Sequence, residues 1–435
     1  MSLSRRKFLT IAGMGVATGV AAASLKNLYI RVANGQNPTI KGLGKLVKDP
    51  NGILDLSPGL QYRIISEGGK PMSDGNPVPT SFDGMAAFPG KNGQTILIRN
   101  HELSPSQSPG VIATEAFQYD KLSKGGTTTV IVNSDRTLDK EFVSLAGTNR
   151  NCGGGTTPWG SWISSEEDVS TPKTNIPEDP NSVSVKHGYN FEVSTQEKRE
   201  KPIPLTAMGR FRHEAIAVDP KTGYIYQTED QVDSCFYRFR PNKSGNLQEG
   251  GTLEALVIDG MPKINTSKNY PLNQPKAVKW VKLEDVDPEQ DTLRYEAQNK
   301  GAAIFSRGEG ICLGNGEIYF TCTDGGNAEK GQIFRYNPVN ETISLFVESP
   351  GKEVLDYPDN LILSPFGDLI VCEDGQDEQF LVGVTPQGEI YQLGRNALNN
   401  SEFAGVCFSP DQKTMFVNIY SPGVTLAVWG NWQKG

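Results

Sequence analysis

The sequence predicts an all-β fold, a six-bladed β-propeller. Glycine and proline are frequent, with 47 and 28 among the 435 residues, and long amphipathic helical patterns are nearly absent. In addition, a turn followed by an apolar strand recurs six times along the chain. Both observations favour many short strands joined by turns over a helical or alternating α/β domain.

The recurring segment ends in acidic residues in five of its six copies. Residues 218–230 show it clearly, because an apolar strand runs directly into Glu229 and Asp230. The other copies span 88–102, 157–168, 313–324, 364–374 and 409–420, the last without a terminal acid. Copies roughly 45 to 95 residues apart are too widely spaced for a tight solenoid and suit the four-stranded blades of a propeller. Two packed β-sandwiches are the structural alternative, but they do not explain why five strands stop in carboxylates.

The N-terminal residues predict export. Arg5 and Arg6 form a twin arginine, a mildly apolar run extends from Ile11 to Leu25, and Ala21–Ala23 offer a small-residue cleavage site. This pattern is typical of a twin-arginine signal peptide, so we expect the export machinery of that pathway as a partner and a periplasmic or secreted location. A membrane anchor is the alternative, but the run is short and rich in glycine and alanine.

The remaining chain is expected to form one domain. We assign residues 1–33 to the signal and a short N-terminal segment, and residues 34–435 to a single propeller with an insertion around 241–302. The net charge of −8 argues against a nucleic-acid partner and is compatible with bound cations. With only three histidines a His-rich metal site is excluded. No segment after the signal is long and apolar enough to span a bilayer, and we expect a monomer.

The acids that end the recurring strands are candidate metal ligands. In a propeller, equivalent positions of all blades converge on one axis, so the acids would meet at one mouth of the channel. They are Glu102, Glu167, Asp230, Asp324, Glu373 and Asp374. Two carboxylates about 4 Å apart repel by about 4 kcal/mol at an effective dielectric near 20. Either several of these acids are protonated or bound cations neutralise them, and we favour bound cations. Hard oxygen ligands favour calcium or a trivalent metal. A single acidic pair is more simply a solvated strand end, and which member of each pair faces inward is open because strand neighbours point to opposite sides.

Three further segments add candidate site residues. Cys152 lies in a glycine-rich turn before the Glu167 strand, Glu214 precedes the 223–230 strand, and Arg307 and Glu309 precede the Asp324 hairpin. A buried structural thiol is the ordinary interpretation of a lone cysteine. Among carboxylates, however, a soft thiolate points to iron. Cys312 and Cys322 could bridge across a hairpin, and the other cysteines have no readable partners.

At these residues the sequence resembles the PhoX family of secreted alkaline phosphatases. The resemblance extends from Asp83-Gly-Met-Ala to residue 423, and its most specific motifs are residues 151–162, 209–214, 357–360 and 372–375. It implies a six-bladed propeller that hydrolyses phosphomonoesters with two oxo-bridged ferric ions and several calcium ions.

The resemblance also implies individual roles. Cys152 matches a thiolate ligand of iron, while Glu167, Glu214 and Glu309 match carboxylates of the metal cluster. Arg307 matches an arginine that holds the substrate phosphate.

The chain departs from the family pattern in places, which puts its substrate preference in doubt. Ser164 and Ser165 stand where the family often has Thr-Cys, and Gly308 stands where well-known members have proline. The chain is also shorter than those members.

Two other functions remain open from the sequence. A calcium-dependent propeller lactonase or esterase would use axial carboxylates without needing Cys152 or Arg307. A non-catalytic propeller that binds cations or phosphate would hold metal without turnover.

Overall fold

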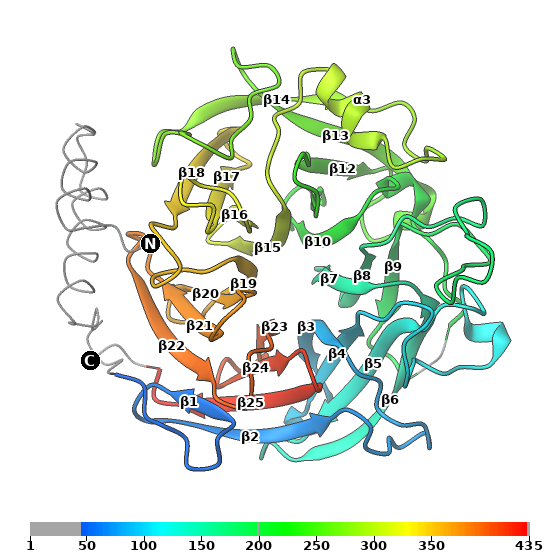
Figure 1. The fold of residues 1–435 in the computed structure, drawn as a ribbon, viewed down its shortest axis with the longest axis vertical. Coiled ribbons are helices and arrows are strands. Elements are labelled where there is room, and N and C mark those ends of the chain that lie inside the picture. The colour runs from blue at the N-terminus through cyan, green and yellow to red at the C-terminus, as the bar shows by residue number, and fades with distance from the viewer. Residues whose placement is uncertain (1–44, 198–199, 433–435) are drawn as a thin grey trace.

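The computed structural model describes residues 45–197 and 200–432, and these residues form an all-β propeller (Figure 1). Within those ranges α3 (Leu293–Asn299) is the single α-helix. The predicted signal segment lies outside the described residues. In the part of the chain that is described, no helix has the length and apolar character needed to cross a membrane.

Six short strands surround the central axis, and each contacts the next until the ring closes (Figure 1). They are β3 (Phe82–Pro89), β7 (Asn151–Thr156), β10 (His213–Val218), β15 (Gly308–Gly314), β19 (Pro358–Leu363) and β23 (Phe403–Phe408). We call them the inner strands. They are rich in small residues because six backbones converge there: a Cβ on Gly155 would lie 2.1 Å from the carbonyl oxygen of Ile216 in the neighbouring strand.

Four sheets extend outward from inner strands in antiparallel order. The first contains β3, β4 (Thr95–His101), β5 (Gly125–Val132) and β6 (Leu138–Thr148). The second contains β7, β8 (Ser161–Glu166) and β9 (Asn190–Ser194). The third contains β19, β20 (Leu369–Glu373), β21 (Phe380–Val384), β22 (Ile390–Asn396) and the short β1 (Leu54–Leu56). The fourth contains β23, β24 (Thr414–Ile419), β25 (Val424–Gly430) and β2 (Leu60–Glu67), so strands from both ends of the described chain pair with each other.

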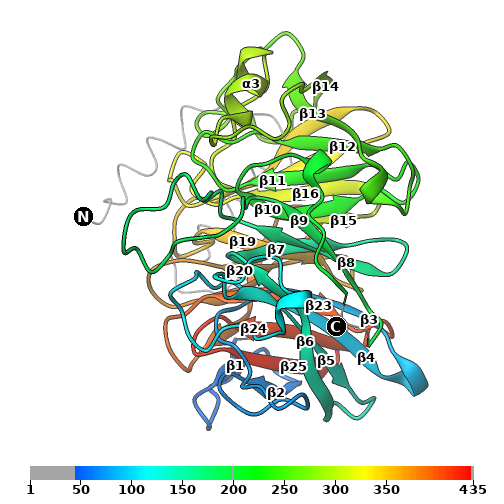
Figure 2. The same ribbon diagram turned by 90° about the vertical axis from the view of Figure 1, so that its right-hand side faces the viewer.

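The fifth sheet has nine strands, so five hydrogen-bonded sheets are present where the sequence predicted six separate blades. One run consists of β10, β11 (Ile225–Glu229), β12 (Tyr237–Pro241) and β13 (Gly251–Ile258). The other consists of β15, β16 (Glu317–Cys322), β17 (Gln332–Asn337) and β18 (Thr342–Glu348). The two runs join through β14 (Lys276–Lys282), which pairs with five residues of β13 and two of β18. Strand β14 and helix α3 come from the region predicted as an insertion and lie at the periphery (Figures 1 and 2).

The hydrophobic core lies between adjacent sheets. Aromatic rings pack between the two runs, for example Phe236, which immediately precedes β12, and Phe320 of β16, whose ring centroids are 4.4 Å apart. Fully burying one such side chain contributes roughly 1.5–3 kcal/mol, so the sheets are held face to face by their apolar surfaces.

The six recurring segments of the sequence form β4, β8, β11, β16, β20 and β24. Each is the second strand of its sheet, one position out from the axis. The inner position belongs to the strand that precedes each recurring turn. The recurring acids therefore follow strands that run antiparallel to the inner strands and end beside their N-terminal ends.

Candidate metal centre

The second residue of each inner strand forms an inner tier around one mouth of the channel. Its members are Asp83, Cys152, Glu214, Glu309, Asp359 and Ala404. In five of the six strands the ladder register shifts immediately after the first residue, and in β23 it shifts one residue later. Such bulges re-aim side chains, so equivalent positions present four acids and a thiol at the same level.

Glycine makes this tier possible because neighbouring strands approach closely there. A Cβ on Gly84 would lie 2.6 Å from the carbonyl oxygen of Cys152. A Cβ on Gly310 would lie 2.5 Å from the carbonyl oxygen of Asp359. Each glycine follows a tier residue and accommodates the tier residue of the next inner strand.

An outer tier comes from the residues that follow the second strands. Its members are Glu102, Glu167, Asp230, Thr323, Asp374 and Tyr420. Each donates its backbone N–H, over 2.9–3.2 Å, to the carbonyl of the residue that precedes an inner strand. Those preceding residues, which we call the rim, are Ser81, Arg150, Arg212, Arg307, Tyr357 and Glu402. Both tiers and the rim are therefore fixed to one another by main-chain hydrogen bonds.

Three inner-tier acids lie close enough to share a cation. One carboxylate oxygen each from Glu214, Glu309 and Asp359 lies within 4.8 Å of the others, and Oδ1 of Asp359 has no hydrogen-bond partner among the described residues. Burial, followed by the charges of neighbouring acids, raises the pKa of Glu214 and Glu309 well above the ordinary value. Burial and the Asp374 charge raise the pKa of Asp359 to about 8. This crowding is relieved when cations replace protons, so the donor set fits hard metal ions.

Cys152 brings sulfur to the same tier. Its Sγ is buried and lies 3.3 Å from the carbonyl oxygen of His213. Burial and the carboxylates of Glu214, Glu167 and Asp83 raise the thiol pKa well above its usual range. A bound cation would counter those effects, because metal coordination favours the thiolate.

The other cysteines are unpaired, as is Cys152. Cys312 lies opposite Tyr319, and Cys322 lies opposite Gly308, so these two thiols do not meet across the hairpin. The structure therefore does not contain the possible Cys312–Cys322 bridge.

Two arginines of the rim neutralise part of the acidic cluster. Arg307 donates through Nε and Nη2 to the two carboxylate oxygens of Asp230, over 2.9 and 3.1 Å. Its Nη2 also lies 2.6 Å from Oε1 of Glu309. Arg150 pairs with Glu102 and, over 2.7 Å, with Glu167. Each guanidinium thus bridges two carboxylates from different strands.

The structure brings together most of the site residues predicted from the sequence. In the two tiers and the rim lie Cys152, Glu167, Glu214, Glu309, Glu102, Asp230, Asp374 and Arg307. It places Asp324 and Glu373 apart. Thr323 occupies the outer-tier position of its strand, and Asp324, one residue later, accepts a hydrogen bond from Ser306.

Glu373 belongs to the strand rather than to the tier. Its Oε1 accepts the backbone N–H of Asp356 over 2.8 Å. Glu166 and Glu229 occupy the equivalent position in their strands and likewise bond within the protein interior. In each acidic pair, therefore, the second residue faces the mouth.

Sequence reasoning missed five charged members of the site: Asp83, Asp359, Glu402, Arg150 and Arg212. Asp83 and Asp359 stand in two of the motifs quoted for the family resemblance, each followed by Gly or Asn. An acid followed by a small residue at the start of a strand was the available signal. Glu402 has no such signature, although burial and the charges of Asp374 and Asp359 raise its pKa strongly.

A buried ion network lies behind the outer tier. His187 donates through Nδ1 to Glu166 over 2.7 Å and through Nε2 to Asp120 over 3.1 Å. All three side chains are fully buried. Glu166 also accepts the backbone N–H groups of Asn149 and Gly188, over 2.9 Å each. The network thus ties together segments on both sides of Glu167.

This network predicts a loss of stability at alkaline pH. Burial lowers the pKa of His187, but the Glu166 charge and hydrogen bonds to both carboxylates outweigh it and raise the pKa to about 9. Protonated His187 stabilises the folded protein, by at most about 3 kcal/mol. This contribution is fully present below pH 6.5, the pKa of an unfolded histidine, and is lost as the pH rises through 9. We expect the melting temperature to fall between pH 7 and 10, with a smaller fall in His187→Gln. Parallel pH profiles of the two proteins would contradict this role.

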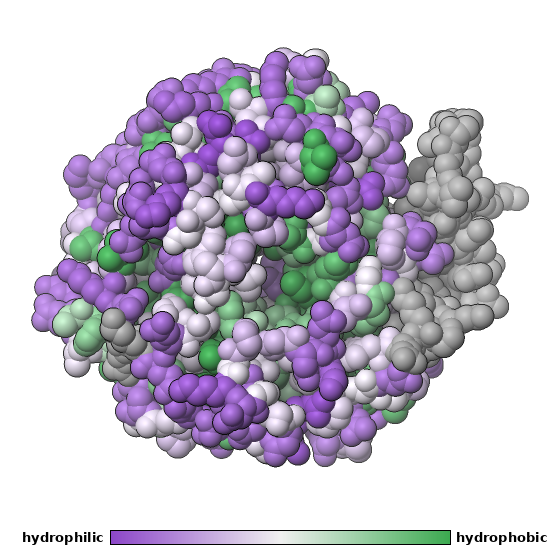
Figure 3. All heavy atoms as spheres, turned by 180° about the vertical axis from the view of Figure 1, so that it is seen from behind, coloured by the Kyte–Doolittle hydropathy of each residue, from purple (hydrophilic) through white to green (hydrophobic). Residues whose placement is uncertain are grey.

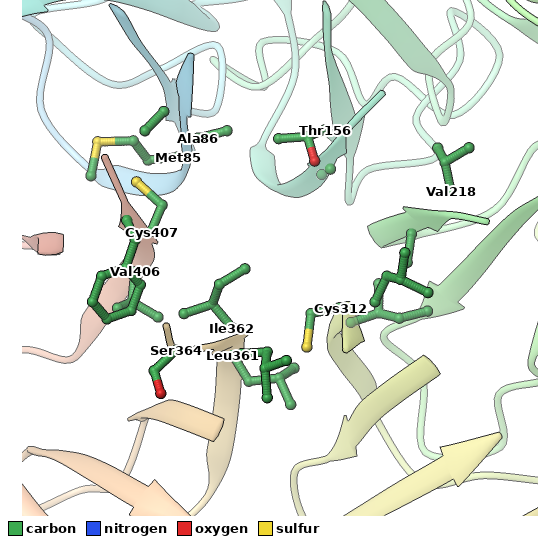
Figure 4. A pocket seen from close by; sticks show the side chains of 18 of the residues that line it. Met85, Ala86, Thr156, Val218, Cys312, Leu361, Ile362, Ser364, Val406 and Cys407 are labelled. Carbon is green, nitrogen blue, oxygen red and sulfur yellow. The ribbon is translucent and has the colours of Figure 1, made fainter. Parts of the chain in front are cut away.

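The opposite end of the channel has different chemistry. There the C-terminal halves of the inner strands line a cavity of about 750 Å³ with apolar side chains such as Met85, Val218, Ile362 and Val406 (Figure 4). The face opposite to that of Figure 1 shows apolar residues gathered in a central hollow (Figure 3). No charged side chain of the described residues lines this cavity, so of the two ends of the channel the acidic mouth is the one suited to charged ligands.

A family model and several solved structures match this chain. The family model described as alkaline phosphatase PhoX matches residues 41–138 and 134–423. The structure of PhoX from Pseudomonas fluorescens in complex with vanadate, a transition-state analogue, is 17% identical with a TM-score of 0.66, covering 90% of this chain and 98% of that one. No curated protein matches the chain.

More distant structures resemble only the overall shape. A gluconolactonase from Xanthomonas campestris is 9% identical with a TM-score of 0.46, covering 90% of this chain and 99% of that one. A protein of unknown function from Dyadobacter fermentans is 8% identical with a TM-score of 0.48, covering 86% and 100%. Scores at this level indicate no function.

Proposed function

Because the chain belongs to the PhoX family of alkaline phosphatases, we propose that it is a secreted enzyme that hydrolyses phosphomonoesters and releases inorganic phosphate. The observation that carries this proposal is an arginine, Arg307, held beside converging carboxylates that need cations. Phosphoryl transfer requires neutralised phosphoryl oxygens, a positioned nucleophile and a stabilised leaving group. The relative from Pseudomonas fluorescens, bound to vanadate as a transition-state analogue, supports the same reaction class.

We propose that the tiers hold two ferric ions and several calcium ions. Carboxylate oxygens of Glu214, Glu309 and Asp359 are hard ligands that suit both metals, and the Cys152 sulfur favours iron. The remaining proposed ligands are Asp83, Glu102, Glu167, Asp230 and Asp374. When bound, these ions would supply Lewis acidity toward the phosphoryl oxygens and activation of the nucleophile.

The role proposed for Arg307 is to hold the transferring phosphoryl group. Its backbone is fixed on both sides, since its N–H donates to Gln231 over 2.8 Å and its carbonyl accepts from Thr323 over 3.0 Å. Its φ of 47° is the left-handed region, which directs the side chain differently from a regular strand residue. The planar fork that now engages Asp230 matches two oxygens of a phosphate equally well.

We propose six blades, with β10–β13 and β15–β18 counted as separate blades that β14 links. The six inner strands and the sixfold pattern of both tiers support that count. Residues 34–435 are proposed to form one domain. Of the predicted insertion around 241–302, β13 completes a blade, and the residues after β13, which include β14 and α3, are proposed as the insertion. The twin arginine supports export by that pathway to the periplasm or beyond, after the cluster has formed.

The function is tested by assaying protein purified with calcium and iron. We expect hydrolysis of p-nitrophenyl phosphate and none of a lactone substrate. Fully metal-loaded protein that cleaves lactones but not phosphate esters, or that cleaves neither, would overturn the proposal.

The role of Cys152 is tested by Cys152→Ser, which keeps the size of the side chain but replaces a soft ligand with a hard, weakly acidic one. We expect loss of iron, of the thiolate-to-iron charge-transfer absorption and of activity. Cys407→Ser is a matched control, because Cys407 is also buried but lies in the apolar half of its inner strand. A Cys152→Ser protein that retains its iron, colour and turnover would exclude the thiolate ligand.

A further inference from the structure

Three successive inner strands carry an arginine at the rim. Arg150, Arg212 and Arg307 precede β7, β10 and β15, while the other three rim positions hold Ser81, Tyr357 and Glu402. One arc of the mouth therefore carries three guanidinium groups, each beside carboxylates. One arginine together with cations suffices for a single phosphoryl group, so the additional arginines point to more negative charge on the ligand.

Arg150 repeats the local structure of Arg307. Each stands two residues before an inner-tier residue, with φ of 48° and 47° respectively. The carbonyl of each accepts the N–H of an outer-tier residue, and each guanidinium bridges two carboxylates. The same left-handed backbone conformation thus directs both side chains toward the mouth.

The two arginines differ in how their donors are used. Arg307 engages Asp230 with both Nε and Nη2. Arg150 contacts Glu102 and Glu167 through Nη2 alone, and its Nε has no hydrogen-bond partner among the described residues. The Arg150 side chain is also more exposed, 41% against 30%. That Nε is buried, whereas Nη1 makes no hydrogen bond or ion pair among the described residues and is not buried. Arg150 therefore retains its Nη1 donors for an oxyanion that approaches from outside the metal cluster.

Arg212 supports the same arc. Its Nε likewise has no hydrogen-bond partner among the described residues, and its ion pair with Asp291 spans 3.6 Å. Such a long, partly exposed pair holds the guanidinium weakly.

We propose that Arg150 binds a second anionic group, a carboxylate or phosphate on the leaving group, and so makes the enzyme favour phosphomonoesters that carry two anionic groups. The proposal rests on the proposed function and assigns a specificity role to a residue outside the metal ligands. Arg307 binds the phosphoryl group that is transferred, and Arg150 binds the second anionic group, which is on the leaving group.

Binding is measured first, with ligands that are not hydrolysed. Calorimetry compares phosphonoacetate, which carries a phosphonate and a carboxylate, with ethylphosphonate, which carries only the phosphonate. We expect Arg150→Ala to weaken phosphonoacetate binding at least tenfold more than ethylphosphonate binding. Arg150→Lys should lose less, because an ammonium keeps the charge without the fork.

Turnover gives a second measurement with 3-phosphoglycerate and glycerol 3-phosphate, which differ by the carboxylate. We expect Arg150→Ala to lower kcat/KM for 3-phosphoglycerate about tenfold relative to glycerol 3-phosphate, mainly through KM. Arg240→Ala is the matched control and should change neither ratio. Arg240 is comparably exposed and pairs with Glu254, but it lies on β12, the third strand from the axis.

The outcomes separate this proposal from the function. Equal effects of Arg150→Ala on both members of each pair would overturn the specificity role. If Arg150→Ala does not fold, Arg150→Lys decides by the same ratios, with an expected threefold change. Wild-type protein that binds both phosphonates but hydrolyses neither ester would overturn the proposed phosphatase function. The ratio of the two binding affinities measured by calorimetry would still test the role of Arg150. Wild-type protein that binds neither would overturn both.

Discussion

Arg307→Ala is expected to lower kcat/KM for p-nitrophenyl phosphate by roughly a hundredfold or more, about 2.7 kcal/mol of transition-state stabilisation. The guanidinium already makes a bidentate contact with Asp230, so its fork is oriented before any substrate arrives. A preoriented donor pair loses little on binding the phosphoryl group and stabilises the charge that develops there. Steady-state kinetics on purified, metal-loaded protein measures the effect.

Two controls separate substrate binding from damage to the cluster. Removing Arg307 also releases Asp230 and Glu309, so calcium and iron contents must be measured in the variant. Arg307→Lys should recover only part of the loss, because an ammonium lacks the planar geometry. Alanine and wild-type rates within a factor of about three, at equal metal content, would remove Arg307 from the reaction.

Calcium removal is expected to abolish activity and to lower thermal stability at the same time. Burial, followed by the charges of neighbouring acids, raises the pKa of Asp83, Glu214 and Glu309 well above the ordinary value and that of Glu167 to about 8. Without cations these groups must bind protons or repel, and a single cation site at a hundred times its Kd contributes about 2.7 kcal/mol. We expect EGTA to lower the melting temperature by at least about 5 °C.

The effects of calcium removal should be reversible. Adding calcium back should restore both activity and melting temperature, whereas magnesium should not, because it demands a smaller octahedral site. Full activity in protein shown by elemental analysis to be free of calcium would contradict the assignment of the carboxylates.

Much of the fold followed from the recurring turn and strand, since strand patterning and turn residues are local properties. The number of hydrogen-bonded sheets could not be predicted from these local properties, because β14 joins two runs by pairing residues that are far apart in sequence. The inner strands were also not identified from the sequence. They contain the small residues that close packing at the axis requires, so their composition is less typical of β-strands than that of the second strands.

The site was predictable where its residues carry a local signature. Cys152 stands among glycines, and Glu167, Asp230 and Asp374 end apolar strands. The sequence did not show the register of the strands, and register decides which residue lies in the outer tier. Thr323 occupies the outer tier, whereas Asp324, one residue later, does not. Only the pairing of each strand with its inner neighbour decides which of two adjacent acids faces the mouth.

The pairing of β2 with β25 has a consequence for how the molecule is made. Strand β2 comes from the first described residues and β25 from the last, and they complete one sheet. Because a chain is made from its N-terminus, the edge of β2 that β25 covers stays unpaired until most of the described chain has been made. Inner strand β23 belongs to the same sheet and lies between β19 and β3 in the ring, so the ring closes late as well. The cations are therefore expected to bind only after this sheet has assembled.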